Sequence, residues 1–273
     1  MNKNNNLALI ALLLIGLISS LTLNLSAQNR VSAENNQTKK AALETNVLER
    51  YIEISSLPLD KKKAVFVKIT PVERSNVFKF HLALQFVNRP TLSQEQKNII
   101  LEGISALSAD AYDKSKDKTN IQIQIQSVEE RAKILFSKNE FVEIFAKLGG
   151  DKDDVAILQK YRDLVSISSK AKRKQSFRES SAKDMSNLWK IQMAYYLAKD
   201  TELNKPQQEF MLRIIDFLKP SMYESSRKDN EEAEFDKILQ EITNEARTLF
   251  TKEKYVEKIF NLGDAEFDPE NTK

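Results

Sequence analysis

The chain has a single imidazole and no thiol with which to carry out chemistry. His81 is the only histidine, and there is no cysteine. A Ser–His–acid triad, a histidine-rich zinc site and a di-iron bundle need more histidine than this, or a different spacing. His81 lies in an apolar segment, where a polar side chain is usually a hydrogen-bonded core group. We therefore predict no catalytic, cofactor-binding or metal-binding residue, and an enzyme is the third choice of function.

The acidic residues suggest neither an acid–base pair nor a metal site. Glu129 and Glu130 are adjacent, so on a helix their side chains point about 100° apart and cannot share a site unaided. Residues 151–154 are mostly aspartate, but they lack the glycine and the distal glutamate of a helical calcium loop. We interpret these carboxylates, together with Glu143 and Glu257, as parts of solvated helix faces.

Two basic triplets are the strongest candidate contact residues. Each triplet ends three residues before a phenylalanine, and the six residues are Lys61, Lys62, Lys63, Lys172, Arg173 and Lys174. Near an anionic membrane each such charge contributes about 1 kcal/mol of attraction, and a negatively charged partner would attract them in the same way. The alternative, which we favour, is the solvated face of a short helix with Phe66 or Phe177 on its apolar side.

The N-terminus has the pattern of an export signal. Lys3 precedes an apolar run from Leu7 to Leu23, and small residues suited to cleavage follow at 25–27 and 31–33. This pattern predicts a cleaved signal peptide over residues 1–27 and a periplasmic or secreted protein, with an uncleaved anchor as the alternative. The net charge is +3, or +2 without Lys3, which is too balanced for a dedicated nucleic-acid binder.

A segment of roughly a hundred residues is present twice. The letters SNVFK at 75–79 recur as SNLWK at 186–190, 111 positions later, and the phenylalanine-led segment at 136 recurs at 250, 114 positions later. An ancestral module was therefore duplicated. The predicted divisions are a signal peptide at 1–27, a disordered lead-in at 28–41, helical units at 42–150 and 154–264, and an acidic tail at 265–273.

The pattern of helix starts predicts an all-α fold for both units. Each unit has hydroxyl or amide residues followed three positions later by an acid or amide, which is the pattern of a capping box. The pairs are Thr70 with Glu73, Ser93 with Gln96 and Ser137 with Glu140, and in the second unit Ser181 with Asp184 and Asn204 with Gln207. Five glycines and six prolines in 273 residues leave few breaks between helices.

One segment by itself favours a strand. Residues 121–126 alternate isoleucine and glutamine, a period of two that is typical of β-structure. Their counterparts at 235–240 have helical spacing instead, and two copies of one unit should share a fold. We therefore predict a helix at both positions.

The spacing that the two units share resembles that of the bacteriocin fulvocin C-related proteins. The likeness covers Leu48 to Gly150 and Leu158 to Gly263, and the matching residues are Phe66, Ser75, Phe78, Lys79, Leu92, Gln96, Phe136, Phe177, Ser186, Trp189, Lys190, Leu203, Gln207 and Phe250. This resemblance implies an exported bacterial protein and supplies no catalytic residue. Residues 92–96 and 203–207 are also similar to the Leu-Thr-x-x-Gln repeats of periplasmic stress chaperones, with Ser or Asn in place of Thr. This weaker resemblance implies client binding without ATP.

These features predict a non-enzymatic, exported helical repeat protein. We expect it to bind protein or peptide partners by helix-in-groove contact, without a cofactor and without nucleic acid, and the oligomeric state is left open. Phe78 and Trp189 are candidates for lining a peptide groove, although packing inside each unit is the favoured alternative. A membrane-active or bacteriocin-like secreted factor that uses the basic triplets is the second choice.

Overall fold

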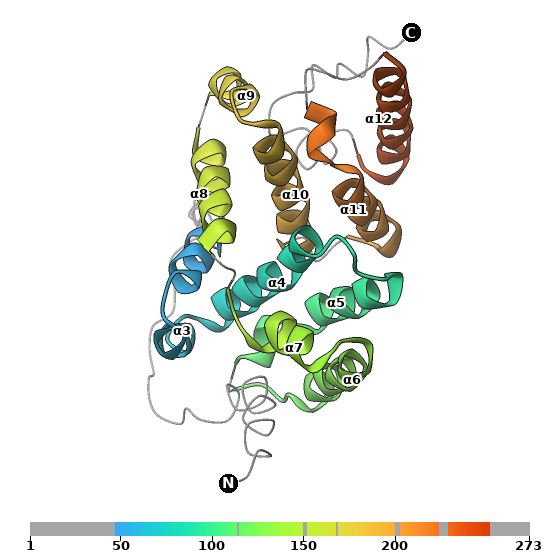
Figure 1. The fold of residues 1–273 in the computed structure, drawn as a ribbon. Coiled ribbons are helices and arrows are strands. Elements are labelled where there is room, and N and C mark those ends of the chain that lie inside the picture. The colour runs from blue at the N-terminus through green and yellow to red at the C-terminus, as the bar shows by residue number, and fades with distance from the viewer. Residues whose placement is uncertain are drawn as a thin grey trace. The chain divides into compact units, whose positions relative to one another are not determined.

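The computed structural model describes residues 47–113, 115–149, 152–167, 169–199, 203–223 and 229–251. Every regular element in these ranges is a helix, and they contain no strand, so the predicted all-α fold is confirmed (Figure 1). The predicted signal peptide (1–27), lead-in (28–41) and acidic tail (265–273) lie outside the described residues, as do the outer limits of the predicted units at 42 and 264.

The chain divides into two compact units. Unit 1 ends at Lys152 and unit 2 begins at Asp153, except that Phe86–Pro90, at the end of a long helix, group with unit 2. Unit 1 consists of a helix over residues 47–55, α3 (Leu59–Phe66), α4 (Pro71–Asn88), α5 (Gln94–Ala106), the 3-10 turn η1 (Ala109–Ala111), α6 (Thr119–Leu135), α7 (Lys138–Phe141) and the π-helical turn η2 (Val142–Ala146).

Unit 2 has a matching order of elements. It consists of α8 (Lys152–Ser166), α9 (Lys170–Arg178), α10 (Ala182–Lys199), α11 (Lys205–Phe217), the 3-10 turn η3 (Pro220–Tyr223) and α12 (Asp229–Leu249). In the contacts between elements α5 packs on α6 in unit 1, and α11 packs on both α10 and α12 in unit 2. The central helix of each unit, α4 or α10, is buried along most of its length.

The helices begin where the capping residues predict. In α5 the Ser93 hydroxyl accepts a hydrogen bond from the Gln96 backbone N–H, and the Gln96 side chain accepts one from the Ser93 N–H. The same reciprocal box opens α4, α7 and α11, and at α10 the Asp184 N–H donates to the Ser181 hydroxyl. Each cap pairs backbone donors that the first helical turn would otherwise leave unsatisfied.

Three aromatic rings fix the short helix α3 against the interior of unit 1. Phe66 meets Phe78 with their ring centroids 6.5 Å apart and meets Tyr112 edge-on at 6.2 Å. Phe66 is therefore the apolar side of the short basic helix, and Phe78 contributes to packing inside the unit.

The same arrangement of rings is found in unit 2. Phe177 meets Trp189 at 6.2 Å and Tyr223 at 6.4 Å, both edge-on. Tyr223 lies 111 positions after Tyr112 in the sequence. Sequence analysis identified the Phe78 and Trp189 pair but missed the two tyrosines, although the same offset pointed to them.

The alternating isoleucine and glutamine segment is helical, as its counterpart predicted. It forms the first turns of α6, and of its isoleucines Ile125 is buried while Ile123 is exposed. Ile125, Val128 and Ala132 lie three and four residues apart and form the buried face. The three alternating isoleucines therefore do not form one buried face, because Ile121 is half-buried, Ile123 is exposed and Ile125 is buried.

The last helical segment of unit 1 is irregular. The helix that begins after Ser137 widens into the π-helical turn η2 and ends at Ala146. Gly149 then takes a positive φ of 110°, as expected of a glycine after a helix. A Cβ atom there would also lie 3.2 Å from the Ser55 Cα atom, and this tight backbone contact adds to the preference for glycine. Gly263 lies outside the described residues.

Candidate functional site

His81 is a structural residue in the interior of unit 1. It is fully buried, and its Nε2 atom lies 3.1 Å from the carbonyl oxygen of Ile144, which can only accept. Its Nδ1 atom then accepts from the Tyr51 hydroxyl at 3.2 Å, with the Gly149 N–H at 3.5 Å. Burial lowers the pKa of His81 to about 4, so the ring is neutral near pH 7. The prediction of a hydrogen-bonded core histidine is confirmed.

The basic triplets do not present three charges each. The middle residue of each triplet is hydrogen-bonded to a backbone carbonyl oxygen. Lys62 donates to the carbonyl oxygen of Leu148 at 3.1 Å, and Arg173 donates to that of Ile167 at 2.7 Å. Burial lowers the pKa of Lys62. Lys61, Lys63 and Lys172 are exposed and Lys174 is half-buried. The surface available to an anionic partner is therefore smaller than the sequence predicted.

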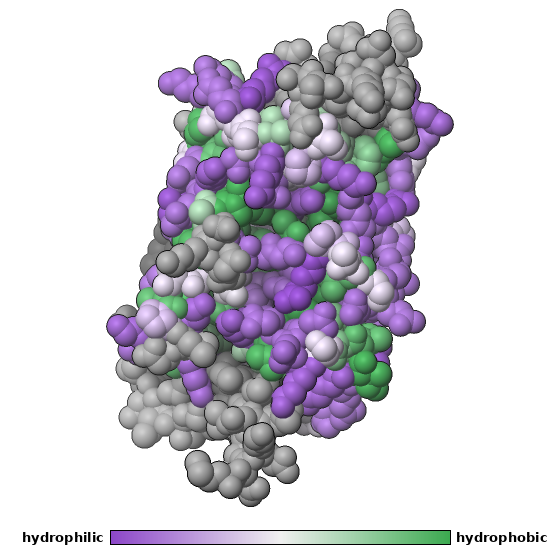
Figure 2. Space-filling view, in the orientation of Figure 1, coloured by the Kyte–Doolittle hydropathy of each residue, from purple (hydrophilic) through white to green (hydrophobic). Residues whose placement is uncertain are grey.

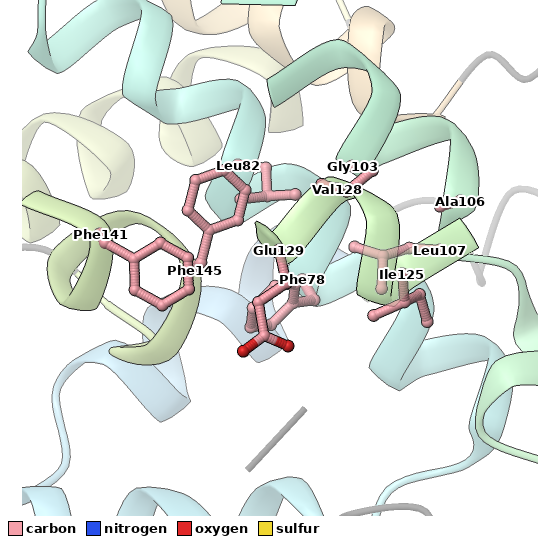
Figure 3. Close-up of a pocket in the computed structure, with 10 residues that line it drawn as sticks. All are labelled: Phe78, Leu82, Gly103, Ala106, Leu107, Ile125, Val128, Glu129, Phe141 and Phe145. Atoms are coloured by element: carbon pink, nitrogen blue, oxygen red, sulfur yellow. The ribbon is translucent and has the colours of Figure 1, made fainter. Parts of the chain in front are cut away.

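An apolar pocket lies inside unit 1, between α4, α5, α6 and the α7–η2 segment (Figure 3). It encloses only about 20 Å³, and the space within and around its open side, solvent included, is about 330 Å³. Its walls are almost entirely hydrocarbon and aromatic, and the lining residues are Phe78, Leu82, Gly103, Ala106, Leu107, Ile125, Val128, Glu129, Phe141 and Phe145. Phe78 therefore both packs on Phe66 and lines a cavity.

Glu129 is the one charged residue in this lining. Its side chain is only 6% exposed, so the interpretation of Glu129 as a solvated residue is wrong. Its Oε1 atom accepts from Lys133 one helical turn later, whereas no described residue donates to Oε2. In Figure 3 the carboxylate points away from Leu82 and toward the edge of the cluster. The sequence contained a signal for this burial, because Ile125, Val128 and Ala132 place position 129 on the apolar face of α6.

Two small residues make room for the pocket. Gly103 and Ala106 are both on α5, and a Cβ atom added to Gly103 would approach Leu82 Cδ1 to 3.2 Å. In unit 2 the residues 111 positions later are Ile214, which is buried, and Phe217. Both side chains are larger than Gly103 and Ala106, and Phe217 is half-buried.

Unit 1 also exposes two large apolar side chains on α6. Ile134 is 83% exposed and Ile123 is 60% exposed. Eleven residues apart on a helix place them about 20° apart around its axis. Figure 2 shows hydrophilic residues over most of the visible face, with a hydrophobic patch over α6. The equivalent residues of α12 are Lys237 and Thr248, so this feature too is confined to unit 1.

Among the described residues, no three acidic or histidine side chains gather where they could hold a metal ion. Within that part of the chain, no helix has both the length and the apolar composition that crossing a bilayer requires.

Known proteins give no further guide to this site. No protein-family model, no curated protein and no solved structure matches the chain.

Proposed function

We propose that the protein is an exported, non-enzymatic binding protein whose unit 1 pocket accepts an apolar side chain of a protein or peptide partner. The pocket itself supports this proposal. It is open on one side and its walls are apolar, so filling it would remove hydrocarbon surface from water at about 25 cal/mol per Å². The space enclosed by the pocket walls is about 20 Å³, far below the roughly 300–1,000 Å³ of pockets that hold cofactor-sized and drug-sized molecules. The pocket therefore suits the tip of one anchoring side chain.

The internal comparison supports the same proposal. We infer that unit 2 is a copy of unit 1 that has larger side chains at two of the equivalent positions, the buried Ile214 and the half-buried Phe217. A fold that is stable with larger side chains at these positions does not need the cavity for folding. Leaving a cavity costs stability, so a cavity retained in one copy fits a role in binding.

A methyl-detected NMR titration tests the proposal with acetyl-leucine-amide as the minimal probe. We expect the probe to shift methyl resonances of Leu82, Leu107 and Val128, and to leave those of Ile191 and Ile215 in unit 2 unchanged. Ala106→Phe, which installs the residue of unit 2, should abolish the shifts without loss of helical circular dichroism. Shifts spread evenly over both units, or shifts that persist in Ala106→Phe, would overturn the proposal.

A second function is favoured by the exposed lysines. Lys61, Lys63 and Lys172 face solvent, so a membrane-active secreted factor could bind anionic lipid through them. Dye release from anionic vesicles, lost when these three become glutamine, would support this function. Lys62 and Arg173 must be left unchanged in that experiment, because their hydrogen bonds to backbone carbonyls are structural.

A further inference from the structure

Glu129 gives the pocket a charge that its own unit only partly satisfies. A buried carboxylate normally has its oxygens paired, because removing an anion from water is costly. Here Lys133 reaches Oε1 alone, and Oε2 has no donor from the described residues. The open side of an otherwise apolar pocket therefore offers one acceptor for a charged or neutral donor.

We propose that the unit 1 pocket selects a peptide segment in which the anchoring apolar side chain neighbours a lysine or arginine, whose cation binds Glu129. This inference rests on the proposed function and specifies its partner. Charge complementarity carries it: the pocket takes the hydrocarbon group, and the carboxylate at its edge takes a cation in a charge-assisted hydrogen bond.

Lys133 is a weak competitor for the same carboxylate. It lies on the same helix four residues after Glu129, and its side chain is 42% exposed. Lys133 can therefore move into solvent when another cation binds the carboxylate. Its Nζ atom also lies 5.6 Å from the centre of the Phe141 ring, which lines the pocket. A ligand cation can therefore bind Oε2 beside Lys133 or replace it at Oε1.

Unit 2 lacks this selectivity. The residue equivalent to Glu129 is Thr243, which is buried and carries no charge. Glu130, next to Glu129, is exposed and does not line the pocket. Threonine is therefore the matched replacement for Glu129, and a substitution at Glu130 is the matched control for a general effect of negative charge.

The experiment compares acetyl-Leu-Lys-amide, acetyl-Leu-Gln-amide and acetyl-Leu-Glu-amide by the same NMR titration. We expect the lysine peptide to bind roughly threefold to tenfold more tightly than the glutamine peptide, and the glutamate peptide to bind most weakly. Glu129→Gln should make the three affinities equal, and Glu129→Thr, which installs the unit 2 residue, should do the same if the glutamine variant fails to fold. Lys133→Gln should strengthen the preference for lysine by removing the competitor.

The outcomes separate the two proposals. If all three peptides bind unit 1 equally, the cation preference is overturned while the apolar anchor survives. If none of them shifts the pocket methyl groups, both proposals fail. If Glu130→Gln reduces the preference as much as Glu129→Gln does, the effect is a general one of negative charge on α6, and the inference is overturned.

Discussion

Unit 1 and unit 2 hold their central helix in place with the same hydrogen bond. Ser75 on α4 donates to the carbonyl oxygen of Leu107 at 2.8 Å, and Ser186 on α10 donates to that of Leu218, also at 2.8 Å. In both units the acceptor is the residue after α5 or α11 ends, whose carbonyl has no partner within its own helix. A serine is therefore required at this position to satisfy a helix end inside the core.

A second shared bond explains the glutamine that follows four residues after a leucine. Gln96 completes its capping box and also donates to the Leu135 carbonyl oxygen at 3.0 Å, and Gln207 does the same to Leu249 at 2.6 Å. One side chain thus begins a helix and ties it to the end of the next. Cap chemistry alone allows glutamate here, but this second bond needs the amide donor.

The two units share these hydrogen bonds at helix ends but differ in the side chains of their interiors. Unit 1 has Gly103 where unit 2 has Ile214, and His81 where unit 2 has Gln192. Hydrogen bonds at helix ends tolerate few replacements, because they need a particular donor at a particular distance. Interior volume can be filled or left open by changes of side-chain size. We infer that the shared hydrogen bonds at helix ends allow the two interiors to differ in volume.

The largest effect on stability should come from disrupting the aromatic cluster that both units share. Phe66 and Phe177 are buried at equivalent positions and each contacts two further rings. Phe66→Ala and Phe177→Ala should each lower the free energy of unfolding by about 3–5 kcal/mol, because each leaves a large cavity. Chemical denaturation of the two variants measures this. A cost below about 1 kcal/mol for one of them would show that the two aromatic clusters are not equivalent.

The next largest effect is a dependence of stability on pH that arises from His81 in unit 1 and has no counterpart at Gln192 in unit 2. The pKa of His81 is lowered from 6.5 to about 4 by burial, so between these values the unfolded chain binds more protons than the folded one. Stability contributed by neutral His81 is present above pH 6.5 and is lost as the pH falls toward 4, by about 3 kcal/mol in all. His81→Gln, the residue of unit 2, should flatten this part of the stability curve. An unchanged slope in that variant would assign the acid sensitivity to other groups.

Local features of the fold were predictable from the sequence, and tertiary ones were less so. Capping boxes such as Ser93 with Gln96 depend on residues three positions apart, so the pattern alone determines them. The inward turn of Lys62 depends on a carbonyl 86 residues away, and no local pattern contains that contact. The pocket depends on the sizes of side chains on four elements, which no local pattern contains. The only sequence signal for it is the internal repeat, in which Ile214 is the counterpart of Gly103.

Two equivalent lysines on the central helices should respond differently to the same change. Lys79 is 6% exposed and no described residue gives its ammonium group a hydrogen bond or a carboxylate, whereas Lys190 has Asp216 nearby. Lys79→Met should therefore raise stability by about 1 kcal/mol, and Lys190→Met should change it less or lower it. Burial lowers the pKa of Lys79, so stability should rise with pH below 10.5, and Lys79→Met should reduce that rise in a urea titration. Equal effects of the two variants would contradict this difference.

The smallest expected effect concerns an ion pair that has opposite polarity in the two units. Arg131 on α6 pairs with Glu102 on α5, whereas at the equivalent positions Glu245 on α12 pairs with Arg213 on α11. Both pairs are exposed, so Arg131→Glu alone should cost only about 0.5 kcal/mol, through like-charge repulsion. Adding Glu102→Arg should restore stability, because it gives unit 1 the polarity of unit 2. Thermal unfolding of the two single variants and the double variant measures the coupling, and a double variant no more stable than Arg131→Glu would show that α5 and α11 do not face their partners in the same register.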